Sequence, residues 1–134
     1  MFTYEKSMTG KGDIQKIWNL YSDVSNWNVW DKSIKSVKLS GNFCVGTNGL
    51  MEMADGQTLP FVLTECIDKK SFTTKSEIGS LIITFGHLLK EDENGVTITH
   101  TVTIDGGDEN QMKGMGRGIT AGIPDCLQQL LYIM

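Results

Sequence analysis

The middle of this sequence repeats one pattern: a short run of alternating apolar and polar residues, followed by a turn rich in Gly, Asn, Asp and Ser. The runs are Ile34–Leu39, Gly46–Met53, Thr58–Ile67, Ser71–Ile78, Leu81–Lys90 and Val96–Ile104. Alternation with a period of two indicates half-buried β-strands. Parallel neighbours would need connections of a dozen residues or more, so the short turns predict successive antiparallel hairpins.

Helical patterns precede this strand region. Residues 2–8 alternate as a first strand, and Asp13 is then placed to cap a helix. The apolar residues that follow this cap at helical spacing are Ile14, Ile17, Trp18 and Tyr21. Trp27 and Trp30, three residues apart, indicate a second short helix. We interpret these aromatic residues mainly as packing residues, with the lining of a pocket end as the alternative.

The last segment, residues 108–134, returns to a helical period. Its recurring apolar residues are Met112, Met115, Ile119, Ile123, Cys126 or Leu127, and Leu130. Pro124 has no amide hydrogen to donate to the carbonyl of Thr120, which predicts a kink. The glycines that weaken the first half are Gly114, Gly116, Gly118 and Gly122. They have two interpretations: a lid that opens over a ligand, or a close approach of the helix to a sheet.

This order of elements predicts an α+β protein, with one strand, two short helices, six strands and a long C-terminal helix. A curved antiparallel sheet of about seven strands, wrapped around that helix, would bury the apolar faces of both. The 134 residues contain no linker and no low-complexity tract, so we expect a single domain over residues 1–134.

The segment Trp18–Ile34 resembles the opening signature of the START/Bet v 1-like superfamily, also labelled SRPBCC or the polyketide cyclase/dehydrase and lipid transport group. Further similar stretches are Ser40-Gly41, Val45-Gly46-Thr47, Thr99-His100-Thr101-Val102 and Ile123-Pro124. The resemblance covers essentially the whole chain and implies a helix-grip fold, with a cavity between the sheet and the terminal helix. Members bind lipids, sterols, hormones, polyketides or other apolar molecules there, and only some catalyse a reaction. No catalytic residue is common to the superfamily.

Charge and composition narrow the classes of partner. The 16 acidic residues exceed the 12 basic ones, and a net charge of −4 disfavours nucleic acid and anionic lipid surfaces. No apolar run approaches the ~20 residues of a transmembrane segment, and no secretory signal pattern is present. The three cysteines form no CxxC pair, so we expect reduced thiols and a cytoplasmic location. Association into a homodimer stays open.

His87 and His100 are the only histidines, and they fall on neighbouring predicted strands. A four-residue loop at Asp92–Gly95 would place them directly opposite each other, whereas a two-residue Asn94-Gly95 turn would make them diagonal. Either register puts both on one otherwise apolar face, which should face the terminal helix. They are candidates for ligand hydrogen bonding or acid–base catalysis, or else are core histidines satisfied by their neighbours.

Known catalytic and cofactor motifs are missing from the sequence. It contains no GxGxxG fingerprint within a βαβ unit, P-loop, GxSxG elbow or HExxH motif. No third ligand falls at a metal-binding distance from the two histidines along the chain. We therefore predict neither a cofactor nor a metal ion.

Methionines form a second group of candidates, because their flexible side chains suit a pocket for varied ligands or simply fill a core. The pattern does not decide which face of two strands is inward: Leu50, Glu52, Phe61, Leu63 and Glu65, or Met51, Met53, Val62, Thr64 and Cys66. The residues predicted to line the cavity are Trp30, Met51, Met53, Phe61, Phe85, His87, His100, Val102, Met112, Met115 and Ile119.

The sequence thus favours a protein that binds a small hydrophobic or amphipathic ligand in an internal cavity. One alternative is a polyketide cyclase/dehydratase-like enzyme that uses His87 or His100 as acid or base. The other is an interaction module whose cavity has closed. Binding is favoured over catalysis because no acid–base pair beyond the histidines is visible.

Overall fold

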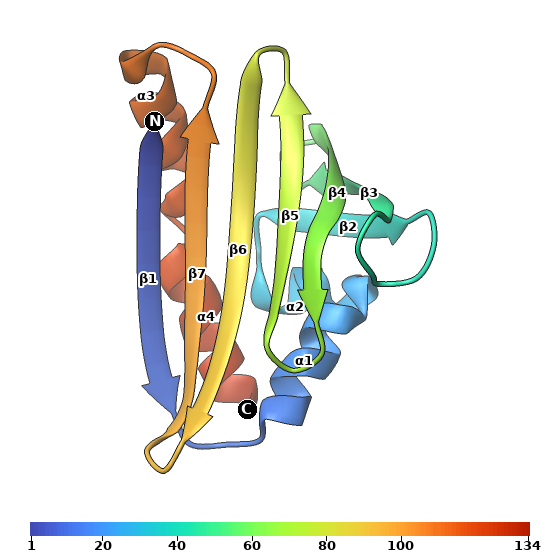
Figure 1. Ribbon diagram of the computed structural model, residues 1–134, viewed down its shortest axis with the longest axis vertical. Helices are drawn as coiled ribbons and strands as arrows, with labels where there is room; N and C mark the ends of the chain where they lie inside the picture. Colours follow the sequence, from blue (N-terminus) through green and yellow to red (C-terminus); the bar gives the residue numbers. More distant parts are fainter.

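The computed structural model describes residues 1–134 and places the elements in the expected order (Figure 1). They are β1 (Phe2–Gly10), α1 (Ile14–Ser22), the short 3-10 helix η1 (Val24–Asn26), α2 (Trp27–Trp30), β2 (Ile34–Leu39), β3 (Asn48–Met53), β4 (Thr58–Ile67), β5 (Ser71–Ile78), β6 (Leu81–Asp92), β7 (Gly95–Asp105), α3 (Glu109–Thr120) and α4 (Ile123–Ile133). The expected strands are confirmed, and their bounds differ from the expected ones by at most two residues.

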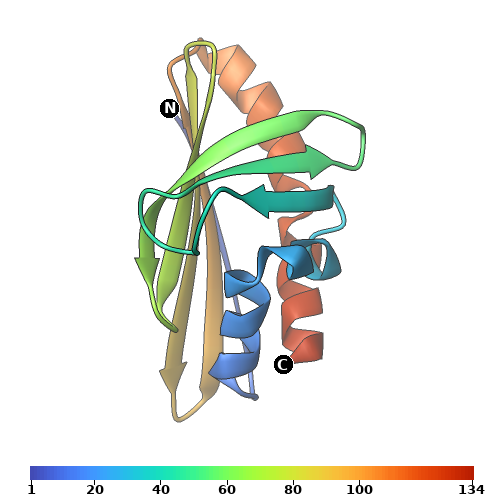
Figure 2. The same ribbon diagram turned by 90° about the vertical axis from the view of Figure 1, so that its right-hand side faces the viewer.

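All seven strands form one antiparallel sheet in the order β1-β7-β6-β5-β4-β3-β2. The short helices α1 and α2 connect the two edge strands, β1 and β2. Figure 2 shows that the sheet curves, so that β2, β3 and β4 reach across toward α3 and α4 on the concave side. The predicted α+β architecture, a curved sheet around a C-terminal helix, is confirmed.

The β6–β7 hairpin fixes the relation of the two histidines. Glu91 pairs with Val96, and in the same register His87 lies directly opposite His100. The alternative turn at Asn94-Gly95 is therefore wrong. Pairing extends to Asp92 and Gly95, so the loop has two residues, Glu93 and Asn94, and the expected four-residue length is wrong although its register is right. Gly95 takes a positive φ of 127° that suits glycine.

The inward face of β3 and β4 is also settled, and the expected grouping of their residues is wrong. Met51 pairs with Leu59 and Gly49 with Phe61, so the methionine face of β3 continues into the Phe61 face of β4. The turn has three residues, because the amide of Met53 donates to the carbonyl of Gln57, and Gly56 within it takes φ 92°. The grouping of Leu50 with Phe61 would need a two-residue Asp55-Gly56 turn, so the extra residue shifts the register by one. Farther along β4, a bulge after Leu63 reverses which residues point inward.

The C-terminal helix is broken at the predicted kink. Thr120 ends α3, Ile123 begins α4, and Pro124 lies in the first turn of α4, where its missing amide hydrogen costs no helical hydrogen bond. Gly116 is buried, and a Cβ there would lie 2.5 Å from the ring of Phe2. The glycine therefore allows α3 to approach β1 closely. None of the helices is both long and apolar enough to cross a membrane.

Candidate functional site

A cavity of about 530 Å³ lies between the inner face of the sheet and helices α2, α3 and α4. Hydrophobic side chains supply 15 of its 27 lining residues, so the wall is mainly apolar. The residues predicted from sequence that line it are Trp30, Met51, Met53, Phe85, His87, His100, Val102, Met115 and Ile119.

Two of the predicted residues, Phe61 and Met112, are buried but do not line the cavity. Phe61 instead stacks on Trp27, with ring centroids 5.6 Å apart, and so supports a side chain that does line it. Sequence reasoning missed Thr74 and Ile83, although alternation along β5 and β6 points both of them inward. It also missed Gly118, because a glycine gives no hydropathy signal.

The exposed lining residues show where the cavity opens. Most of them come from the β3–β4 turn and from the region of the helix break, and include Asp55, Gln57, Thr58, Gly118 and Gly122; Ser33 and Ile78 are exposed as well. Figure 2 shows the β3–β4 hairpin reaching toward the C-terminal helices. The mouth therefore lies between this turn and the α3–α4 junction.

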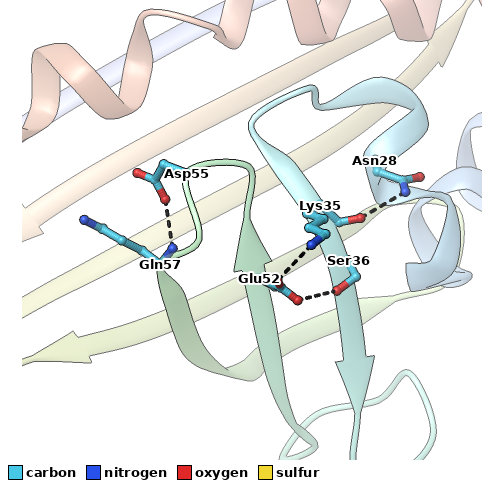
Figure 3. A network of polar contacts seen from close by, with 6 residues as sticks. All are labelled: Asn28, Lys35, Ser36, Glu52, Asp55 and Gln57. Carbon is cyan, nitrogen blue, oxygen red and sulfur yellow. Dashed lines mark hydrogen bonds and ion pairs between the residues drawn. The ribbon is translucent and has the colours of Figure 1, made fainter.

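Polar contacts hold the mouth side of the sheet in place (Figure 3). Asn28 Nδ2 donates to the carbonyl of Lys35 at 3.1 Å, which ties α2 to β2. Lys35 Nζ lies 3.3 Å from Glu52 Oε1, and Asp55 Oδ1 accepts from the amide of Gln57 at 2.9 Å. The ion pair connects β2 with β3, but it is largely exposed and contributes little stability.

Buried aromatic rings close the end of the cavity opposite α3. Tyr21 is fully buried at their centre, 5.4 Å from the ring of Trp30 and 4.8 Å from that of Phe72, centroid to centroid. The indole N–H groups of Trp27 and Trp30 both have hydrogen-bond partners. Trp27 Nε1 donates to the carbonyl of Tyr21 at 2.8 Å, and Trp30 Nε1 donates to the carbonyl of Leu20 at 3.2 Å. These bonds fix α2 against α1, and leave the face of Trp30 to line the cavity.

The two histidines lie side by side within this cluster. Their ring centroids are 4.6 Å apart and their planes nearly perpendicular. The His87 ring stacks on Phe72 at 3.9 Å, and its Nδ1 donates to the Phe72 carbonyl at 3.2 Å. His100 Nε2 lies 2.7 Å from the hydroxyl of Tyr21. Each ring is therefore held by one hydrogen bond while it borders the cavity.

Burial keeps these groups uncharged. It lowers the pKa of His87 from 6.5 to about 3, although the hydrogen bond to the Phe72 carbonyl acts in the opposite direction. Burial, and then the neighbouring His87, lower the pKa of His100 well below 6.5. Burial also raises the pKa of Tyr21 well above 10. At neutral pH both imidazoles are neutral and the phenol keeps its proton.

The cysteines do not add a reactive group to the site. All three are free thiols, and only Cys126 lines the cavity. Burial, followed by the nearby Asp31 carboxylate, raises its pKa to about 12, so it stays protonated. No group of three or more His, Cys, Asp or Glu side chains is arranged to hold a metal ion.

Comparisons with known proteins rest on structure. No family model and no curated protein matches the sequence. Protein MLL2253 from Mesorhizobium loti superposes with a TM-score of 0.80 at 14% identity, covering 98% of this chain and 96% of that one. Ara h 8.0201 gives a TM-score of 0.70 at 15% identity, covering 98% of both chains.

The di-domain ARO/CYC StfQ from the steffimycin biosynthetic pathway is also similar. It gives a TM-score of 0.77 at 14% identity, with 98% of this chain aligned to 49% of StfQ. At such identities the likeness concerns the fold and carries no activity across. The expectation from the Trp18–Ile34 segment is confirmed at this level: the chain has the helix-grip fold of the START/Bet v 1-like superfamily.

Proposed function

We propose that this protein binds a small hydrophobic or amphipathic molecule in the cavity between the sheet and the C-terminal helices. The observation that carries the proposal is the cavity itself. Its volume of about 530 Å³ lies within the range of roughly 300–1,000 Å³ that is usual for small-molecule sites. Its mainly apolar wall with a few buried polar groups is also typical of such sites.

The state of the histidines supports binding over acid–base catalysis. A general base works best when its pKa lies near the operating pH, and burial moves the pKa of both histidines well below that range. Neutral imidazoles still donate and accept hydrogen bonds. The two neutral histidines can therefore take part in ligand recognition without a change of protonation state.

A fluorescent probe tests the proposal. N-phenyl-1-naphthylamine is uncharged and apolar, and its fluorescence should rise when it enters the cavity. It should also raise the melting temperature, because a ligand that binds only the folded state stabilises that state. An absence of both effects, repeated across alkanols, sterols and aromatic compounds, would support the alternative of a closed-cavity interaction module.

Two glycine variants locate the bound probe. Gly118 lines the cavity with open space where a Cβ would be, so Gly118→Leu should fill the mouth and weaken probe binding roughly tenfold or more. Gly114 also has open space, lies on the same helix and does not line the cavity, which makes Gly114→Leu the matched control. Equal binding by the two variants would place the probe elsewhere.

A further inference from the structure

We infer that Thr74, His87 and His100 form an uncharged hydrogen-bonding site on the cavity wall, which binds one hydroxyl or carbonyl group of an otherwise apolar ligand. The cavity is thereby selective for neutral ligands over carboxylates of the same shape. This inference rests on the proposed function, because it names the class of ligand that the cavity takes.

His87 presents an acceptor to the cavity. Its Nδ1 lies 3.2 Å from the Phe72 carbonyl oxygen, which can only accept, so the ring proton is on Nδ1. The neutral ring then carries a lone pair on Nε2, and no protein group donates to it. His87 lines the cavity, so a ligand hydroxyl is the partner that this lone pair lacks.

His100 presents a donor. The side chain of Tyr21 is fully buried, and His100 Nε2, at 2.7 Å, is the hydrogen-bond partner of its hydroxyl. A buried hydroxyl that did not donate would leave its proton unpaired, so Tyr21 donates and Nε2 accepts. The neutral ring of His100 therefore carries its proton on Nδ1. That N–H makes no hydrogen bond within the protein.

Thr74 adds a hydroxyl group, which can donate or accept a hydrogen bond. It is 2% exposed and lines the cavity, yet its hydroxyl has no protein partner. On β5 it lies one inward position after Phe72, which pairs with His87, and Thr74 itself pairs with Phe85 on β6. Acceptor, donor and hydroxyl thus come from three neighbouring strands, β6, β7 and β5, on one inner face.

The charges around the cavity exclude an anionic headgroup. The charged side chains that line it are Asp31, half-buried, and Asp55, exposed at the mouth. No Lys or Arg lines it, and burial opposes protonation of either histidine. A carboxylate would lose its hydration without gaining a cation, whereas a hydroxyl or a carbonyl is satisfied by the neutral groups present.

Three ligands with the same ring system test the inference: naphthalene, 2-naphthol and 2-naphthoate. Their affinities for the intact protein are measured by titration calorimetry at pH 7.5. Two neutral hydrogen bonds should make 2-naphthol bind about tenfold more tightly than naphthalene. The carboxylate should bind at least about tenfold more weakly than 2-naphthol. Naphthoate binding as tightly as naphthol would overturn the inference.

Variants assign the effect to the named groups. In Tyr21→Phe/His100→Phe both partners of the buried hydrogen bond become apolar, which keeps the core satisfied. In Thr74→Val a hydroxyl without a protein partner is replaced by a methyl group of similar shape. In each variant the ratio of the affinity for 2-naphthol to the affinity for naphthalene should fall several-fold relative to the native protein, whatever happens to the affinity for naphthalene itself. A preference that stays unchanged in both variants would overturn the inference, and Thr74→Val decides if the double variant does not fold.

The test separates failure of the inference from failure of the proposed function. If naphthalene binds and 2-naphthol gains no affinity, the cavity binds apolar molecules and the hydrogen-bonding site is wrong. If none of the three compounds binds, the proposed function fails and the inference fails with it.

Discussion

The hydroxyl of Tyr21 lies 2.7 Å from Nε2 of His100, and this bond joins helix α1 to strand β7 of the sheet across 79 positions of sequence. Both side chains are buried, so neither has water as an alternative partner. The same contact fixes α1 in the fold and the orientation of an imidazole in the cavity. One hydrogen bond thus links a helix of the fold to a residue of the candidate site.

Tyr21→Phe should destabilise the protein by about 1–3 kcal/mol, because the buried Nε2 of His100 loses its donor. Adding His100→Phe removes the unsatisfied nitrogen and should recover much of that loss. Urea unfolding of the native protein, both single variants and the double variant measures the coupling. Additive effects would contradict a direct interaction between the two side chains.

Acid should destabilise the folded state as the pH falls below about 6.5. Both histidines have a lower pKa when folded than the usual 6.5, so the unfolded chain binds more protons below that pH. Their contribution to stability is complete above about pH 6.5 and decreases as pH falls toward the folded value, about 3 for His87. Each histidine should lower the free energy of unfolding by at most about 1.4 kcal/mol per pH unit in this range.

The measurement is the free energy of unfolding in urea at pH 7.5, 6.5, 5.5 and 4.5. His87→Phe keeps an aromatic ring against Phe72 and removes one titrating group, so its stability should fall less steeply with acid. If the stability of the native protein does not change from pH 6.5 to 4.5, the folded state does not hold the two histidines in their neutral form.

Two glycines of α3 should respond oppositely to alanine. At Gly116 a Cβ would lie 2.5 Å from the Phe2 ring, so Gly116→Ala should cost roughly 1–3 kcal/mol. At Gly118 there is open space, and Gly118→Ala should gain up to about 1 kcal/mol of helix propensity. Thermal unfolding compares the two. Of the two interpretations of these glycines, the contact with Phe2 supports the close approach at Gly116, and the lid stays a prediction for the others.

Much of the fold could be predicted because it depends on local patterns. The period of two gave the strands, and Pro124 gave the helix break. The predicted faces of β3 and β4 were wrong because one extra turn residue, with Gly56 at positive φ, shifted the pairing of the two strands by one residue. The hydrogen bond of Tyr21 to His100 could not be predicted, since neither residue carries a local sign of a partner so distant in sequence.

The reactivity of the thiols gives a test of how well the cavity is closed. Cys44 is exposed and should react with iodoacetamide in the folded protein at pH 8. Cys126 is buried and its pKa is raised to about 12, so at pH 8 only about one thiol in ten thousand is ionised. Peptide mapping by mass spectrometry should find Cys126 unmodified until urea unfolds the chain. Modification of Cys126 at the rate of Cys44 would mean that Cys126 is not shielded from solvent in the folded protein, because a thiolate needs hydration to form.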